Sequence, residues 1–88
     1  MKALHQKRFL HELANITSPI RSNIEKFAFE DILKLNSVEE SGKIERMKGY
    51  RGYYKVRFGD YRVGIKVEGD TVIFERVKNR KDIYKFFP

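Results

Sequence analysis

Four cationic side chains are expected on one face of a hairpin over residues 53–67. The segments 53–58 and 61–67 both alternate polar and apolar residues, and Gly59-Asp60 lies between them. A two-residue loop that begins with glycine is typical of a type II′ turn, because glycine takes a positive φ without steric cost. This turn predicts the register, since successive side chains of a strand alternate between its faces. The pairs on the polar face are Arg57 with Arg62, Lys55 with Gly64, and Tyr53 with Lys66.

The predicted pairing of Arg57 with Arg62 indicates a site for an anion. Like charges directly opposite each other destabilise a sheet. A solvated basic face is the ordinary interpretation of exposed cations, but scattered surface charge usually mixes signs. We therefore favour a site for a polyanion such as RNA phosphate. We also expect glutamine at either position to leave the free protein as stable as before or slightly more stable.

Cations and tyrosines of this kind can cleave RNA without a metal ion. The 2′-OH of the substrate can attack its own neighbouring phosphate if the protein orients the sugar, stabilises the phosphorane and assists proton movement. Arginine and lysine donors meet the developing charge, and a lysine or tyrosine can assist the proton. The candidate residues in the sequence are Lys48, Arg51, Lys55, Arg57, Arg62, Arg80, Lys81 and Tyr84.

The residues that other kinds of catalytic or cofactor site require are absent from the sequence. There is no cysteine, which excludes a thiol nucleophile and a disulfide framework. His5 and His11 are six residues apart and would lie on different helical faces, so they cannot chelate a metal ion locally. No glycine-rich phosphate loop precedes a helix. We therefore expect no metal site and no small-molecule cofactor.

The charge of the chain is unevenly distributed. The 88 residues have a net charge of +7 and are expected to form one domain over 1–88. Residues 1–42 hold six Lys/Arg and six Asp/Glu, so the whole excess lies in residues 43–88. This asymmetry points to nucleic acid or another polyanion. Mean hydropathy is −0.60 and there is no long apolar run, so we expect no membrane span and a cytoplasmic protein.

Two helices are expected before the sheet. Apolar spacing predicts a short helix over Lys7–Ala14. Ser18 is expected as the N-cap of a second helix with Pro19 at its first position. Its apolar stripe would be Ile20, Ile24, Phe27 and Ala28. Ile32, Leu33 and Leu35 would broaden that stripe or begin another short helix, and the polar segment 36–42 would be a connection.

The remaining segments are expected to complete an antiparallel sheet, which with the two helices makes the fold class α+β. Residues 43–48 form a candidate strand with Ile44 and Met47 facing inward. A last strand over Thr71–Val77 has two possible registers. One places Val72, Phe74 and Arg76 on the core face, and the other places Thr71, Ile73, Glu75 and Val77 there. Residues 82–87 would be a terminal helical turn or a strand end.

Segments of the C-terminal half resemble the RelE/ParE superfamily of toxins. The run Gly-Asp-Tyr-Arg, followed at this spacing by Arg-Lys-Asp-x-Tyr, is fairly specific for the superfamily and separates its branches less well. The resemblance is good over residues 43–85 and general over 1–42. The segments are Lys48-Gly49, Tyr54-Lys55-Val56-Arg57, Gly59-Asp60-Tyr61-Arg62-Val63 and Asn79-Arg80-Lys81-Asp82-Ile83-Tyr84.

The resemblance implies a fold and an activity. The family fold packs two N-terminal helices on a small antiparallel sheet. Members of the RelE branch are ribosome-dependent mRNA endonucleases that a cognate antitoxin holds inactive, whereas ParE-type members lack the RNase residues and poison DNA gyrase. By resemblance the catalytic residues are Lys55, Arg57, Arg62, Arg80 and Tyr84. We expect Lys48, Arg51, Lys66 and Lys81 to bind RNA.

The resulting hypothesis is a type II toxin that cleaves mRNA on the ribosome through 2′-OH attack. Its partners would be the mRNA and a cognate antitoxin. Retention of both Arg80 and Tyr84 favours the RelE branch. Lys55 and Tyr84 remain alternatives for removal of the 2′-OH proton. The alternatives for the whole protein are a ParE-like gyrase inhibitor and a non-catalytic RNA-binding module.

Overall fold

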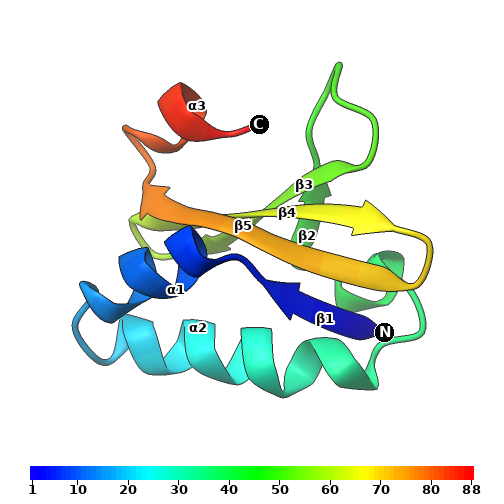
Figure 1. The fold of residues 1–88 in the computed structure, drawn as a ribbon, viewed down its shortest axis with the longest axis horizontal. Helices are drawn as coiled ribbons and strands as arrows, with labels where there is room; N and C mark the ends of the chain where they lie inside the picture. Colours follow the sequence, from blue (N-terminus) through cyan, green and yellow to red (C-terminus); the bar gives the residue numbers. More distant parts are fainter.

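A five-stranded sheet runs through the middle of the molecule in the computed structural model, which describes residues 1–88. Helices α1 (Lys7–Ala14) and α2 (Ile20–Phe29) cover one face, and the one-turn helix α3 (Ile83–Phe86) lies on the other (Figure 1). This confirms the α+β class with two N-terminal helices. The strands are β1 (Lys2–His5), β2 (Ile44–Arg46), β3 (Tyr53–Phe58), β4 (Tyr61–Glu68) and β5 (Thr71–Asn79), in the order β1-β5-β4-β3-β2 across the sheet.

The hairpin of β3 and β4 has the predicted register. Arg57 is opposite Arg62, Lys55 is opposite Gly64, and Tyr53 is opposite Lys66. The φ of Gly59 is +58° and no residue other than glycine has a positive φ, as a type II′ turn requires. The turn therefore places the four hairpin cations on the face that α1 and α2 leave uncovered.

Strand β5 follows neither of the two predicted registers along its whole length. Its first half starts from the two-residue Gly69-Asp70 turn, so Val72 and Phe74 face the core. A bulge then shifts the register, because Ile65 is paired with Phe74 but Gly64 with Arg76. The extra residue reverses the alternation, which is what a bulge does. Val77 consequently enters the core, whereas the prediction of Arg76 on the core face is wrong.

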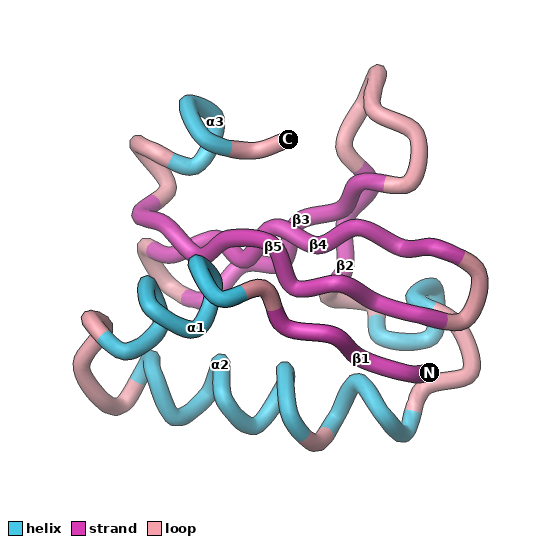
Figure 2. The backbone as a smooth tube through the Cα atoms, in the orientation of Figure 1, coloured by secondary structure: helices cyan, strands magenta, loops and turns pink.

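The sheet is mixed rather than wholly antiparallel. Strand β1 lies at its edge and runs parallel to β5, with Lys2 opposite Thr71 and His5 opposite Phe74. Backbone hydrogen bonds from Lys2 to Asp70 (2.9 Å) and from Gln6 to Phe74 (3.0 Å) extend the pairing. Strand β1 covers the edge of the first half of β5, and helix α1 lies beside the second half (Figure 2).

The two helices begin close to the predicted positions. Helix α1 has the predicted bounds Lys7–Ala14. Helix α2 begins at Ile20 after Pro19, and no side chain caps it, so the prediction of Ser18 as its N-cap is wrong. The Ser18 hydroxyl contacts the Ser22 hydroxyl at 3.3 Å instead of a backbone N–H.

Short 3₁₀ turns connect α2 to β2. The turn η1 (Asp31–Lys34) follows α2 directly, and η2 (Val38–Ser41) lies within the segment predicted as a polar connection, with Val38 buried. Ile44 packs against the main core. Met47 instead belongs to a small cluster with Ile83 and Phe87 on the other side of the sheet, so the expectation that it shares the inward face of Ile44 is wrong. Strand β2 ends before Met47, and the alternation ends with it.

The main core lies between the sheet and the two helices. Phe9 and Phe74 are fully buried there, and their ring centroids are 5.3 Å apart. Full burial of a side chain of this size stabilises the fold by about 1.5–3 kcal/mol. The other principal members are Leu13, Ile24, Phe27, Ala28, Ile32, Val56, Val63, Ile65, Val72 and Val77. The helices are all too short or too polar to cross a membrane.

Candidate active site

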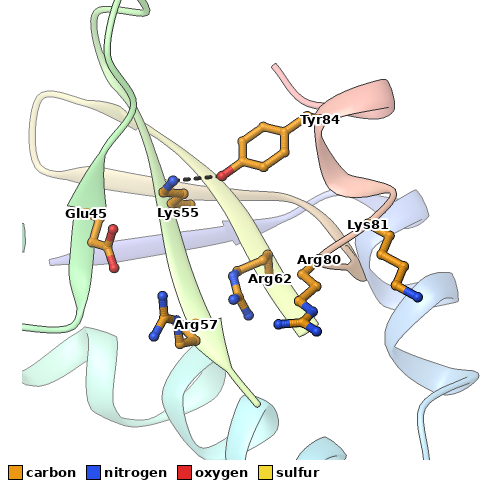
Figure 3. A pocket seen from close by; sticks show the side chains of 7 residues that line it. All are labelled: Glu45, Lys55, Arg57, Arg62, Arg80, Lys81 and Tyr84. Carbon is orange, nitrogen blue, oxygen red and sulfur yellow. Dashed lines mark hydrogen bonds between the residues drawn. The ribbon is translucent and has the colours of Figure 1, made fainter. Parts of the chain in front are cut away.

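A cationic pocket of about 430 Å³ opens on the sheet face opposite α1 and α2. It brings together all five residues that the family resemblance implies are catalytic, although they come from strands β3 and β4 and from the C-terminal segment after β5. Figure 3 shows the ends of Arg57, Arg62 and Arg80 gathered on one side of the pocket, with Lys55 and Tyr84 on the other. The lining residues are Glu45, Lys55, Arg57, Arg62, Arg80, Lys81 and Tyr84.

Arg80 is placed beside the hairpin by contacts to the turn between β3 and β4. Its backbone N–H donates to the Asp60 carbonyl at 2.7 Å, and its Nε lies 3.8 Å from Asp60 Oδ1. The backbone contact holds the end of β5 against the turn. The side-chain pair is solvent-exposed and contributes little to stability. A residue 18 positions beyond Arg62 in the chain thereby reaches the same pocket.

Tyr84 is held over the sheet by one neighbour in α3 and by the residue that follows the helix. Ile83 and Phe87 are buried against Met47 and Tyr53, while Tyr84 itself is 58% exposed. Gly64 makes this seat possible, because a Cβ built at Gly64 would lie 2.6 Å from Cδ2 of Phe87. A missing side chain in the middle of β4 therefore allows the C-terminal segment to lie directly on the strand.

Lys55 and Tyr84 form the most direct contact in the cationic pocket. The Lys55 Nζ donates a hydrogen bond to the Tyr84 hydroxyl oxygen at 2.7 Å. The same ammonium lies 5.3 Å from the centre of the tyrosine ring. The phenolic oxygen accepts this bond with one lone pair, so its own hydrogen is free to donate to another group. Negative charge that develops on this oxygen during a proton transfer would be stabilised by Lys55.

The two paired arginines differ in their contacts. Arg62 folds back on the turn, and its Nη1 donates to the carbonyls of Gly59 (2.7 Å) and Tyr61 (2.9 Å). Arg57 is exposed and is absent from the ion pairs of the chain. No carboxylate of the chain therefore neutralises the charge of Arg57, which remains available to an anion.

Sequence analysis missed one residue of the cationic pocket, the carboxylate of Glu45. It lies on β2 directly opposite Lys55 on β3. The signal was available, because a strand over residues 43–48 was expected, but the pairing of that strand with β3 depends on a loop whose length predicts no register. No group of three or more His, Cys, Asp or Glu side chains lies close enough to hold a metal ion.

Three of the four predicted RNA-binding residues lie outside the cationic pocket. Lys81 lines it but extends away from the other cations (Figure 3). Lys66 shares their face of the sheet, but its Nζ pairs with Glu68 at 3.0 Å, and the hydrogen bond that Lys66 donates to Glu68 raises the pKa of Lys66. Lys48 and Arg51 lie in the loop between β2 and β3, where Arg51 lines a separate cavity.

Glu12 on α1 connects the helix to the last strand beside the cationic pocket. Its carboxylate accepts hydrogen bonds from the Arg76 guanidinium at 2.6 Å and the Val77 N–H at 3.1 Å, and it pairs with Lys78 at 3.0 Å. Arg76 and Lys78 both lie within 5 Å of the ring centre of Phe86 in α3. Burial alone raises the pKa of Glu12, but these donors outweigh it and hold that pKa below its ordinary value.

A sheet with two helices on one face and a cluster of cations with a tyrosine on the other defines a small toxin fold. The chain belongs to the RelE/ParE family of type II toxins. The family model described as "ParE toxin of type II toxin-antitoxin system, parDE" matches residues 5–84. The chain is also 44% identical over 89 residues to Toxin RelE3 of Methanocaldococcus jannaschii, with full coverage of both chains. The predicted family is therefore confirmed.

Solved structures show the same fold. The RelB-RelE antitoxin-toxin complex from Methanococcus jannaschii contains a chain that is 42% identical, with a TM-score of 0.80 and coverage of 97% of this chain and 99% of that one. The archaeal RelE-RelB complex from Pyrococcus horikoshii matches at 21% identity and a TM-score of 0.70, with coverage of 90% and 93%. The intact E. coli RelBE complex matches at 20% identity and a TM-score of 0.68, with coverage of 89% and 94%.

Proposed function

We propose that this toxin cleaves mRNA on the ribosome by attack of a 2′-OH on the adjacent phosphate. The observation that supports this proposal is the cationic pocket, where Lys55, Arg57, Arg62, Arg80 and Tyr84 converge and Lys55 contacts Tyr84 at 2.7 Å. A face that only binds RNA requires the cations. It does not require that one of them, Lys55, donate a charge-assisted hydrogen bond to the Tyr84 hydroxyl.

The reaction needs one proton removed and one supplied. The 2′-oxygen loses its proton and forms a bond to phosphorus, and the bond from phosphorus to the 5′-oxygen breaks. The products are a 2′,3′-cyclic phosphate and a 5′-hydroxyl, whose oxygen receives a proton. In the proposal Arg57, Arg62 and Arg80 stabilise charge on the non-bridging phosphate oxygens.

Proton transfer is assigned to Tyr84, with Lys55 as its partner. Arg57 stays protonated and so cannot act as a base. The Lys55 ammonium has no lone pair while it donates to Tyr84, whereas the phenolic oxygen has both a second lone pair and a hydrogen. In the proposal Tyr84 accepts the 2′-OH proton on this second lone pair and gives its own hydrogen to the departing 5′-oxygen, so the two transfers balance. Lys55 would stabilise the negative charge that develops on the tyrosine oxygen when donation runs ahead of acceptance.

The proposal includes a cognate antitoxin and a cytoplasmic location, where the ribosomes are. The 42%-identical relative was solved as an antitoxin-toxin complex. A small domain with a net charge of +7 complements an acidic segment that folds on contact. Such a partner would neutralise the toxin by covering or distorting the cationic pocket.

A ParE-like action on DNA gyrase is the second candidate, because the matching family model has the ParE description. A gyrase inhibitor needs neither Arg80 nor Tyr84 in a shared pocket, so their convergence favours cleavage. The two functions differ in their product, since the first yields cut mRNA and arrested translation and the second yields gyrase-dependent DNA damage.

Removal of one hydroxyl from the cationic pocket tests the proposal. Tyr84→Phe is expected to lower the cleavage rate on translating ribosomes by about 10²–10⁴-fold, the usual range for a group that transfers a proton. Tyr50→Phe is the matched control, because Tyr50 is 53% exposed, Tyr84 is 58% exposed, and Tyr50 lies outside the pocket. Full cleavage by Tyr84→Phe, or gyrase-dependent damage by the parent without cut mRNA, would contradict the proposal.

A further inference from the structure

A second cavity lies at the loop between β2 and β3, which projects from the end of the sheet (Figure 1). Arg46 is opposite Tyr54 in the β2–β3 register, and Tyr54 alternates with Lys55 along β3. Tyr54 and Val67 line the cavity from the helix-covered face of the sheet, whereas Met47 belongs to the cluster with Ile83 and Phe87 on the other face. The cavity therefore lies at the end of the sheet, and none of its residues lines the cationic pocket. This loop cavity measures about 700 Å³ and is lined by Arg46, Met47, Gly49, Tyr50, Arg51, Gly52, Tyr54 and Val67.

The loop is held in one shape by its own backbone. Hydrogen bonds from Met47 to Tyr53 (2.9 Å), from Tyr50 to Met47 (3.2 Å) and from Tyr53 to Tyr50 (3.2 Å) close it on itself. The Val67 N–H donates to Gly52 at 2.8 Å and ties the loop to β4. Gly49 and Gly52 supply the positive φ values, +82° and +83°, that the reversals need. The backbone that carries the side chains at its tip thus has little conformational entropy left to lose on binding.

The residues of the loop cavity combine an exposed aromatic ring with cations. Tyr50 is 53% exposed and no other side chain covers its ring in an aromatic or cation–π contact. Arg46 and Arg51 are exposed at either side of it in the sequence, and no carboxylate lines the cavity. Proteins bind single-stranded nucleic acid with this combination, because bases stack on aromatic rings while cations contact the phosphates.

We infer that the loop cavity is a second contact site for single-stranded RNA, in which a base stacks on Tyr50 and neighbouring phosphates contact Arg46 and Arg51. The inference rests on the proposed function, since that function makes RNA the ligand of this toxin. It adds a site at the end of the sheet that shares no residue with the cationic pocket, where the scissile phosphate would lie. The RNA is either the flank of the mRNA or an unpaired segment of ribosomal RNA.

Binding of a 2′-O-methylated single-stranded RNA with 2-aminopurine as one base tests stacking without cleavage. Tyr50→Ala is expected to weaken binding about tenfold and to remove the fluorescence quenching that stacking causes, whereas Tyr50→Phe keeps both. Arg51→Gln is expected to lower the slope of log affinity against log salt by about 0.7, the value for one phosphate contact on a single strand. Lys34→Gln is the charge-matched control, since Lys34 is an exposed cation of η1 outside both cavities.

Co-sedimentation with ribosomes distinguishes the two sources of RNA. A loss on Tyr50→Ala that appears only with ribosomes carrying mRNA assigns the contact to mRNA, and a loss that appears equally with vacant ribosomes assigns it to ribosomal RNA. The inference is overturned if Tyr50→Ala and Arg51→Gln bind both the oligonucleotide and the ribosomes as the parent does. It is also overturned if Tyr50→Ala loses only the binding of the antitoxin, because the loop is then a protein interface.

The same variants separate this inference from the proposed function. If Tyr84→Phe loses cleavage while Tyr50→Ala binds RNA normally, the proposed function stands and the inference about the loop cavity is rejected. If the parent protein cuts no RNA but binds it in a way that depends on Tyr50, the inference about the loop cavity stands and the proposed cleavage is rejected. A thermal melt of each variant confirms that it is folded, since Tyr50 and Arg51 are exposed and make no core contact.

Discussion

Replacement of Arg57 by glutamine removes a charge from the cationic pocket and removes no ion pair within the chain. Arg57 lies opposite Arg62 in the β3–β4 register. A like-charged pair at this position costs about 0.2–1 kcal/mol, by analogy with the size of other cross-strand pairs. Glutamine is of similar reach and is neutral, so Arg57→Gln is expected to raise the free energy of unfolding by up to that amount. For a domain of this size this is a rise in Tm of roughly 1–8 °C.

The same substitution should slow cleavage. A hydrogen bond to a charged group contributes about 1.5–3 kcal/mol, and each 1.36 kcal/mol is about tenfold in rate. One lost contact between Arg57 and the phosphate therefore predicts a loss of roughly ten- to 150-fold. A gain in stability together with a loss of activity is the pattern of a residue retained for function rather than for folding.

Arg62→Gln is the matched comparison, because its position in the register is equivalent and its contacts are not. Arg62 donates to the carbonyls of Gly59 and Tyr61. These bonds stabilise the turn, and a net value of about 0.5–1.5 kcal/mol each outweighs the relief of repulsion. Arg62→Gln is thus expected to lose about 1 kcal/mol of stability as well as activity. This revises, for Arg62, the expectation from the sequence that glutamine at either position would leave the protein as stable or slightly more stable.

Thermal melts and a cleavage assay on translating ribosomes measure both quantities. The reasoning is refuted if Arg57→Gln melts lower than the parent and cleaves at the parental rate, since Arg57 would then be structural. If Arg62→Gln gains as much stability as Arg57→Gln, the claim that the hydrogen bonds of Arg62 stabilise the turn is wrong. Lys34→Gln again serves as the control for the loss of one charge far from the pocket.

Three further predictions concern the surroundings of the pocket. Gly64→Ala is expected to lower the stability by about 1–3 kcal/mol and to lower cleavage, because its Cβ would displace Phe87 and with it Tyr84; full activity in this variant would show that the seat of α3 is dispensable. Glu12 has a lowered pKa, so its contribution to stability is complete above its ordinary value of 4.5 and is lost as the pH falls through its folded value. Denaturant unfolding between about pH 3 and 7 should show this acid loss in the parent and a flatter profile in Glu12→Gln. Excess cognate antitoxin should suppress cleavage in a titration, less effectively at high salt, and a toxin that stays active in its presence would contradict the proposed partner.

Local patterns were enough to predict the elements that present the cations. The register of β3 and β4 follows from the Gly59-Asp60 turn, because a two-residue loop leaves only one pairing for the strands beside it. Helix α1 follows from apolar residues at helical spacing. The sequence therefore predicts that Arg57 and Arg62 lie opposite each other, as they do in the structure. Both the turn and the helix are determined by residues close together in the chain.

Contacts between distant segments decided the rest. The parallel pairing of β1 with β5 joins residues about 70 positions apart, and the bulge in β5 that turns Arg76 away from the core appears in no local pattern. The contact of Lys55 with Tyr84 depends on the packing of Phe87 against Gly64. Glu12 forms its hydrogen bond with Arg76 and its ion pair with Lys78 only because α1 lies along the free edge of β5. The sequence by itself determined which side chains share a strand face, since that depends on alternation and one turn. The tertiary structure alone decided which of them touch, because that depends on how the whole chain fills the space around the sheet.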